Sequence, residues 1–181
     1  PPTPPPPPPP QFDRRRQRQM CIRDRFSPEQ RAVYEVVLRA QKQSIAAVKP
    51  GVTLEQIHDG AVRAITEGLI GIGLLEGDVD ALIQDKKHEA FYMHRTSHWL
   101  GMDVHDVGRY FVDGAHRPLE PGFVLTIEPG IYIATDAEDV DERWRGIGVR
   151  IEDDVAVTSD GHEVLTAGIP KELDEVEAAC S

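Results

Sequence analysis

The chain has 181 residues, of which 40% are hydrophobic, so it is long enough for one domain with a substantial core. Its 20 basic and 31 acidic side chains leave a formal charge of -11, which argues against a nucleic-acid-binding protein, because such proteins need a basic face. No run of roughly 18 or more apolar residues occurs, so we expect no membrane span. Two cysteines cannot build a disulfide framework, and we therefore predict a reducing compartment, the cytoplasm.

Residues 1–25 differ in character from the rest of the chain. Nine of the first ten are proline, a run that adopts polyproline II, and residues 11–25 hold six arginines and two aspartates. This segment has too few apolar side chains to offset the entropy of ordering. We expect residues 1–25 to be a disordered, non-native segment and residues 26–181 to be the folded domain. A proline-rich ligand for an SH3-type module is the alternative interpretation.

The first part of the folded domain has the pattern of helices. Ser27 and Thr53 each begin a capping box, with a glutamine three residues later. Apolar residues keep helical spacing from the first box to Lys49-Pro50-Gly51. They do so again from the second box to the glycines at 68, 71 and 73. A short third helix is predicted over about 78–85.

After about residue 90 the pattern changes to short strands. Residues 123–127 (FVLTI) form a predicted strand, and 146–152 (GIGVRIE) and 154–158 (DVAVT) form two more, close to a hairpin. Residues 171–179 have the pattern of a terminal helix. Helices followed by strands predict an α+β fold, in which helices cover one face of an antiparallel sheet.

The densest group of polar side chains lies between residues 94 and 106. His94, His98 and His105 fall there together with two aspartates. Imidazole is the commonest metal ligand and the side chain best suited to proton transfer near neutral pH, so this stretch indicates a metal or catalytic site. A polar loop of solvated histidines is the alternative. The other histidines lie in polar context, and we expect them to be solvated: residues 58, 88, 116 and 162.

Two glutamates lie at the ends of predicted strands. Glu128 follows FVLTI directly, and Glu152 ends GIGVRIE. A carboxylate at the end of a buried strand is costly unless it is paired or binds a metal, so the alternative is a salt bridge to Arg150. His98 with the two glutamates gives a nitrogen and two oxygens, a donor set that suits Mn, Zn or Co. Arg150 and Glu152 are two residues apart and face the same side of their strand.

Three segments, in order, resemble aminopeptidase P, one of the pita-bread metallopeptidases. They are SHWLGMDVHDVG (97–108), LTIEPGIYI (125–133) and GIGVRIEDDVAVT (146–158). The resemblance covers nearly all of residues 26–181. It implies the C-terminal portion of a pita-bread fold, with a curved antiparallel sheet and helices on its outer face. It also implies a metal-dependent aminopeptidase that releases the first residue from peptides with proline in the second position.

By this resemblance the metal ligands are His98, Glu128 and Glu152, and the expected metal is Mn, with Zn or Co as alternatives. The family binds two ions through five ligands, of which two are aspartates upstream of these motifs. Asp13 and Asp24 copy the spacing of those aspartates, but an arginine-rich run is no buried strand, and we reject them as ligands. We expect this chain to hold one ion or none and to be inactive, although the intact parent is an enzyme.

The resemblance also implies roles for the residues around the metal. Glu128 transfers the proton, His94 and His105 lie on the substrate side, and Tyr132 and Arg150 stand behind the ligands. The partners would be peptide substrates, and homo-oligomerisation of the intact parent stays open. A prolidase-type dipeptidase is one alternative function. A non-catalytic pita-bread module that binds peptides or proteins is another.

Overall fold

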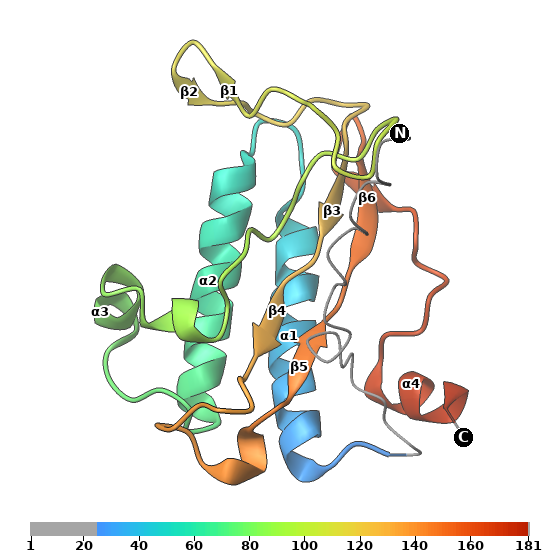
Figure 1. Ribbon diagram of the computed structural model, residues 1–181. Coiled ribbons are helices and arrows are strands. Elements are labelled where there is room, and N and C mark those ends of the chain that lie inside the picture. The colour runs from blue at the N-terminus through green and yellow to red at the C-terminus, as the bar shows by residue number, and fades with distance from the viewer. Residues whose placement is uncertain (1–24, 181) are drawn as a thin grey trace, which may run out of the picture.

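The structure is a computed structural model that describes residues 25–180 (Figure 1). The predictions for Asp13, Asp24 and the proline-rich segment lie outside the described residues. The helices are α1 (Pro28–Ala47), α2 (Leu54–Gly71), α3 (Val79–Gln84) and α4 (Leu173–Ala179), with 3₁₀ turns η1 (Lys87–Ala90) and η2 (Glu142–Trp144). The strands are β1 (Phe111–Val112), β2 (Ala115–His116), β3 (Val124–Ile127), β4 (Gly130–Tyr132), β5 (Gly148–Arg150), β6 (Asp153–Val157) and β7 (His162–Val164). Among these residues, no helix combines the length and hydrophobicity that crossing a bilayer requires.

Both predicted capping boxes are present. The Ser27 hydroxyl accepts from the Gln30 backbone N–H, and the Gln30 side chain accepts from the Ser27 backbone N–H. Thr53 and Gln56 make the same pair of bonds at the start of α2. Each cap satisfies N–H groups that have no partner inside the helix, and a cap residue contributes about 1 kcal/mol. The positions at which α1 and α2 begin are therefore explained by local chemistry.

Two long antiparallel strands, each interrupted at the same level, form the centre of the sheet (Figure 1). β3 pairs with β6, β4 pairs with β5, and β7 extends the first pair on the other side of β6. The prediction of a hairpin between residues 146–152 and 154–158 is wrong. β5 and β6 do not pair with each other but follow one another, because each pairs with a different part of residues 124–132.

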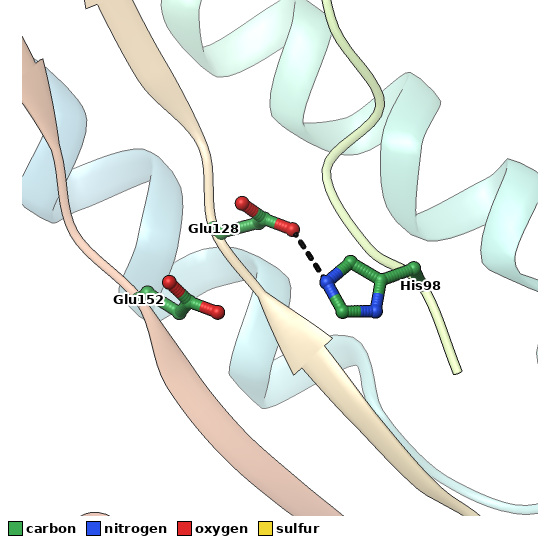
Figure 2. Close-up of side chains that lie close together, drawn as sticks. All are labelled: His98, Glu128 and Glu152. Atoms are coloured by element: carbon green, nitrogen blue, oxygen red, sulfur yellow. Dashed lines mark ion pairs between the residues drawn. The ribbon is translucent and has the colours of Figure 1, made fainter. Parts of the chain in front are cut away.

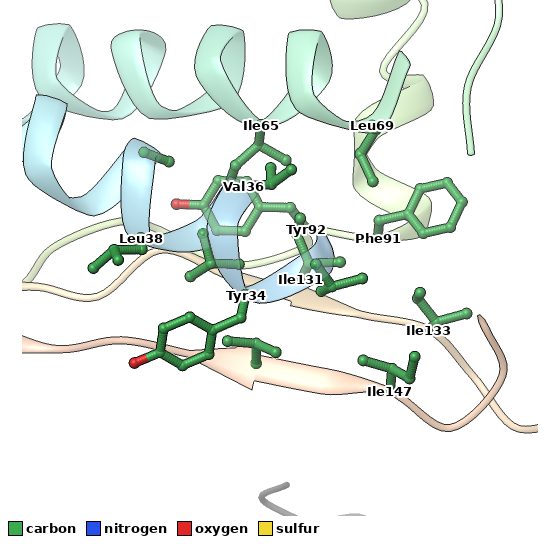
Figure 3. Close-up of a cluster of buried hydrophobic side chains, with 14 of the residues drawn as sticks. Tyr34, Val36, Leu38, Ile65, Leu69, Phe91, Tyr92, Ile131, Ile133 and Ile147 are labelled. Atoms are coloured by element: carbon green, nitrogen blue, oxygen red, sulfur yellow. The ribbon is translucent and has the colours of Figure 1, made fainter. Parts of the chain in front are cut away.

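Helices α1 and α2 pack together and bury one face of the sheet (Figure 3). Val37, Ile65 and Ile131, from α1, α2 and β4, are all fully buried. Burial of such a side chain contributes roughly 1.5–3 kcal/mol. This arrangement confirms the predicted α+β fold with helices on one face of an antiparallel sheet.

Gly68 is a contact position between the two long helices. A Cβ atom at this glycine would lie 2.2 Å from Cγ1 of Val36 on α1, so only glycine allows the helices to approach this closely. α2 continues past it to Gly71. The glycines at 68 and 71 therefore do not both mark the end of the helix, since the first is set by packing.

Candidate metal centre

Glu128 and Glu152 lie in the two interruptions of the central strands. Ile127 is opposite Asp153 and Gly130 is opposite Arg150, so both ladders share one register and Glu128 lies opposite Glu152. The two carboxylates project to the same side, towards the imidazole of His98 (Figure 2). One ligand atom from each of these three side chains lies within 4.8 Å of the others.

His98 is brought to the sheet by the segment 96–100, which runs along β3. The backbone N–H of Glu128 donates to the Thr96 carbonyl at 2.8 Å, and that of Thr126 donates to the His98 carbonyl at 3.0 Å. The His98 N–H in turn donates to the Thr126 hydroxyl at 3.1 Å. These bonds place the imidazole beside Glu128.

The hydrogen bonds of His98 define how its ring faces the glutamate. Nδ1 lies 3.0 Å from the backbone carbonyl of Trp99, which only accepts, so Nδ1 carries a proton. In the neutral ring Nε2 then holds a lone pair, and it lies 3.1 Å from Oε1 of Glu128. Two acceptors at this distance require a proton or a cation between them. A backbone bond to one ring nitrogen is also how metal-bound histidines are commonly oriented.

The electrostatics at Glu152 also favour a bound cation. Partial desolvation of its carboxylate, and next the negative charge of Glu128, raise the pKa of Glu152 above its usual value. Like charges directly opposite each other on paired strands destabilise a sheet. A divalent cation between the two carboxylates would remove that repulsion, so the residues present fit a bound metal with one nitrogen and two oxygen ligands.

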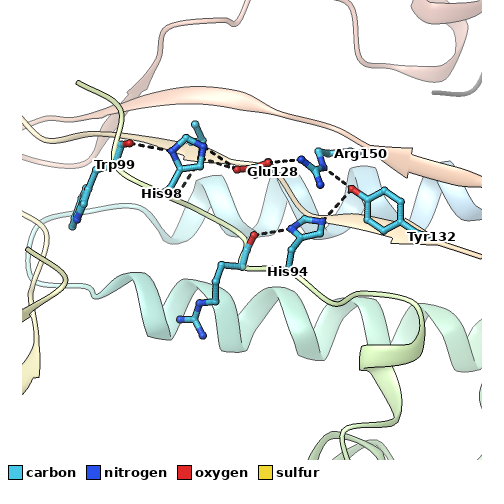
Figure 4. A network of polar contacts seen from close by, with 8 residues as sticks. His94, His98, Trp99, Glu128, Tyr132 and Arg150 are labelled. Carbon is cyan, nitrogen blue, oxygen red and sulfur yellow. Dashed lines mark hydrogen bonds and ion pairs between the residues drawn. The ribbon is translucent and has the colours of Figure 1, made fainter. Parts of the chain in front are cut away.

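A chain of hydrogen bonds supports Glu128 from behind (Figure 4). The Arg150 guanidinium donates to Oε2 of Glu128 at 3.1 Å and, through Nε, to the hydroxyl of Tyr132. The Tyr132 hydroxyl lies 3.1 Å from Nε2 of His94. It donates there, because the Nδ1 proton of His94 faces the Arg95 carbonyl. The predicted alternative, a salt bridge to Arg150, is therefore present at Glu128, through the carboxylate oxygen that does not face His98.

Comparison with known proteins identifies the family of this chain. The model of metallopeptidase family M24 matches residues 17–159. The chain belongs to family M24. The Xaa-Pro aminopeptidases of Haemophilus influenzae and Escherichia coli are 50% and 48% identical to it, over 86% and 87% of this chain.

This M24 chain spans only about a third of the length of those relatives, 36% and 35%. The structure of Pseudomonas aeruginosa aminopeptidase PepP superposes with a TM-score of 0.85 at 58% identity. That match covers 87% of this chain and 36% of the other. The expected fold, the C-terminal portion of a pita-bread domain, is confirmed.

The third predicted histidine of the M24 site, His105, lines a cavity of about 450 Å³. It is exposed, and its ring stands edge-on to that of His98, with centroids 4.2 Å apart. Glu128, His58 and Trp99 also line this cavity. The structure therefore brings all the predicted site residues into one region. His94 is connected to Glu128 by hydrogen bonds through Tyr132 and Arg150.

Three of the four histidines that we expected to be solvated are not. His88 is buried, and His58 and His162 are half-buried and hydrogen-bonded. Only His116 is exposed. For His58 the reason is the helix: side chains on one helix face recur every three or four residues, so the exposed Asp59 beside it faces another direction. The apolar spacing of α2 places Ile57 and Ala61 in the core, and His58 lies beside that stripe.

Proposed function

We propose that the intact protein is a metal-dependent Xaa-Pro aminopeptidase, which releases the first residue from peptides with proline in the second position. The observation that carries this proposal is the convergence of His98, Glu128 and Glu152. The similarity to Xaa-Pro aminopeptidases supports the choice of substrate. An enzyme is favoured over a non-catalytic binding module, because a module without catalysis would not need this donor set. A prolidase-type dipeptidase is the alternative within the same chemistry.

We propose Mn as the metal, with Zn or Co as alternatives for the same donor set. Bound there, a divalent ion would supply a Lewis acid and lower the pKa of water, to about 7 in favourable zinc sites. Two ions are proposed for the intact protein. For the polypeptide of 181 residues, which offers three ligands among its described residues, we propose one ion or none and no hydrolysis.

Glu128 is the residue to which we assign proton transfer. Arg150 holds one carboxylate oxygen, so the other keeps its direction towards His98 and the cavity. From there it can accept a proton from the attacking water and pass it to the amine of the leaving peptide.

We propose different roles on the substrate side for the two remaining histidines, His94 and His105. Both ring nitrogens of His94 are engaged, by Arg95 and Tyr132, and burial lowers the pKa of His94, so the ring stays neutral and oriented. His105 makes no hydrogen bond within residues 25–180 and faces the cavity. We therefore assign it contact with the peptide, where an imidazole can donate to a carbonyl oxygen as negative charge develops.

We also propose that the folded domain begins after residue 25 and that the intact protein is located in the cytoplasm.

The test uses a chimaeric protein, in which residues 26–181 are joined to the upstream part of the Escherichia coli relative, and assays it loaded with Mn. Release of the first residue from an Xaa-Pro peptide, but not from the matching Xaa-Ala peptide, is expected. A folded protein that leaves both peptides intact would contradict the proposed activity. Turnover by the 181-residue polypeptide alone would contradict its proposed inactivity.

A further inference from the structure

The segment of residues 96–100, which carries His98, has β3 on one side and a cluster of polar side chains on the other. Thr96, between His94 and His98, has no exposed surface. Its hydroxyl lies 2.8 Å from Nδ1 of His58 on α2 and also contacts the hydroxyl of Tyr92. Its backbone N–H donates to the same Nδ1 at 3.3 Å. We call His58, Tyr92 and Thr96 the Thr96 clamp.

The hydrogen bonds of the Thr96 clamp run in one direction. Nδ1 of His58 accepts from a backbone N–H, so the proton of the neutral ring is on Nε2. The Thr96 hydroxyl then donates to Nδ1, and the Tyr92 hydroxyl donates to Thr96. Burial lowers the pKa of His58 to about 4 and raises the pKa of Tyr92, which keeps the imidazole neutral and the phenol protonated. Only this order gives each of the three contacts one donor and one acceptor.

The same short segment carries the contacts of the metal centre. The Thr96 carbonyl accepts from the Glu128 N–H, and two residues later the His98 carbonyl accepts from the Thr126 N–H. The segment is thus held by β3 on one side and by α2, through His58, on the other. α2 also contacts the segment through the Arg95–Glu55 ion pair and through Trp99, which shares a core cluster with Leu54 and Ile57. The clamp differs from these contacts in that it bonds both the backbone and the side chain of Thr96, two residues before His98.

We propose that His58 is a positioning residue for the metal centre. Through Thr96 it fixes the segment that presents His98 to Glu128, without touching a metal ligand itself. The purpose of this positioning rests on the proposed function, but the positioning is a property of the fold and can be measured without metal or substrate.

The test is amide hydrogen exchange in the metal-free protein. In His58→Ala the Thr126 and Glu128 amides, which bond to the segment, should exchange about tenfold faster, the loss expected for roughly 1.4 kcal/mol of hydrogen bonding. The Ile133 amide, which donates to the Ile147 carbonyl elsewhere in the sheet, serves as the reference and should keep its rate. His58→Asn, whose side-chain carbonyl can accept from Thr96, should restore protection.

His162→Ala is the matched control. His162 is also half-buried, and its Nδ1 bonds to the Val48 carbonyl, far along the chain from the segment. This variant should leave the Thr126 and Glu128 amides unchanged.

Two results would overturn the positioning role. One is unchanged exchange of Thr126 and Glu128 in His58→Ala. The other is faster exchange of Ile133 to the same degree, which would give His58 a general structural role. Neither result bears on peptide hydrolysis, so failure of this inference and failure of the proposed function are distinguishable.

Discussion

Glu128 and Glu152 lie directly opposite each other on neighbouring antiparallel strands, where both ladders are interrupted. Two carboxylates in register repel each other, and here they share an imidazole whose acceptor nitrogen also faces them. Without metal, the carboxylates of Glu128 and Glu152 destabilise the fold by repelling each other. With a divalent ion between them, the two carboxylates and the imidazole of His98 would serve as three ligands.

Replacement of Glu152 should separate metal binding from stability. In Glu152→Gln the repulsion is removed, so the metal-free protein should unfold at a free energy about 0.2–1 kcal/mol higher. Any rise in melting temperature on addition of Mn should disappear, because a ligand is lost. Calorimetry with and without Mn measures both effects. Glu163→Gln, an exposed glutamate on β7, should change neither. A destabilised metal-free Glu152→Gln would contradict the repulsion.

Arg150 should not be replaceable by lysine. Its guanidinium bonds Glu128 and Tyr132 at once, and a lysine ammonium is a point charge on a flexible stem that cannot hold that geometry. We expect Arg150→Lys to weaken Mn binding by about 10–100-fold, the usual effect of removing a group that orients a ligand. Titration of the Mn signal by electron paramagnetic resonance in the chimaeric protein provides the measurement. Arg143→Lys, at an exposed position of η2, should bind Mn as the unmodified protein does.

Acid should destabilise the metal-free protein partly through His58. The pKa of His58 is about 4 in the folded chain and near 6.5 in the unfolded chain. Between these values the unfolded state binds more protons, so stability falls as pH drops from about 6.5 towards about 4. In His58→Asn this fall should be smaller, although His94 and His88, whose pKa values burial also lowers, keep part of it. Urea denaturation at several pH values gives the free energy of unfolding as a function of pH. If His58 contributed nothing, that free energy would fall equally with pH in the unmodified protein and in His58→Asn.

Gly68 should tolerate no larger residue. Gly68→Ala places a Cβ against Val36, and overpacking of this kind typically costs 1–3 kcal/mol, roughly, in the free energy of unfolding. Gly71→Ala, at the end of the same helix, meets no atom within 4 Å and should be neutral or stabilising by about 0.5–1 kcal/mol. Denaturant midpoints of the two variants should therefore move apart. Equal midpoints would mean that the helices can separate at no cost.

Elements that have a local cause are predictable from the sequence. The capping boxes at Ser27 and Thr53 set the starts of α1 and α2, because a cap involves only residues three positions apart. Glu128 and Glu152 at strand ends predict carboxylates that need a partner, because burial of an unpaired charge is costly. The family and the ligand set follow from the resemblance of the three motifs and not from the local pattern.

How these elements pack together depends on long-range contacts. Whether β5 pairs with β6 or with β4 depends on contacts between residues about twenty positions apart, and strand patterns of this kind are the same in both arrangements. The short strand β4 and the partial burial of His58 likewise have no local signal, because both result from contacts with distant residues. The register that sets Glu128 against Glu152, and the segment that brings His98 to them, are long-range properties of the packed sheet.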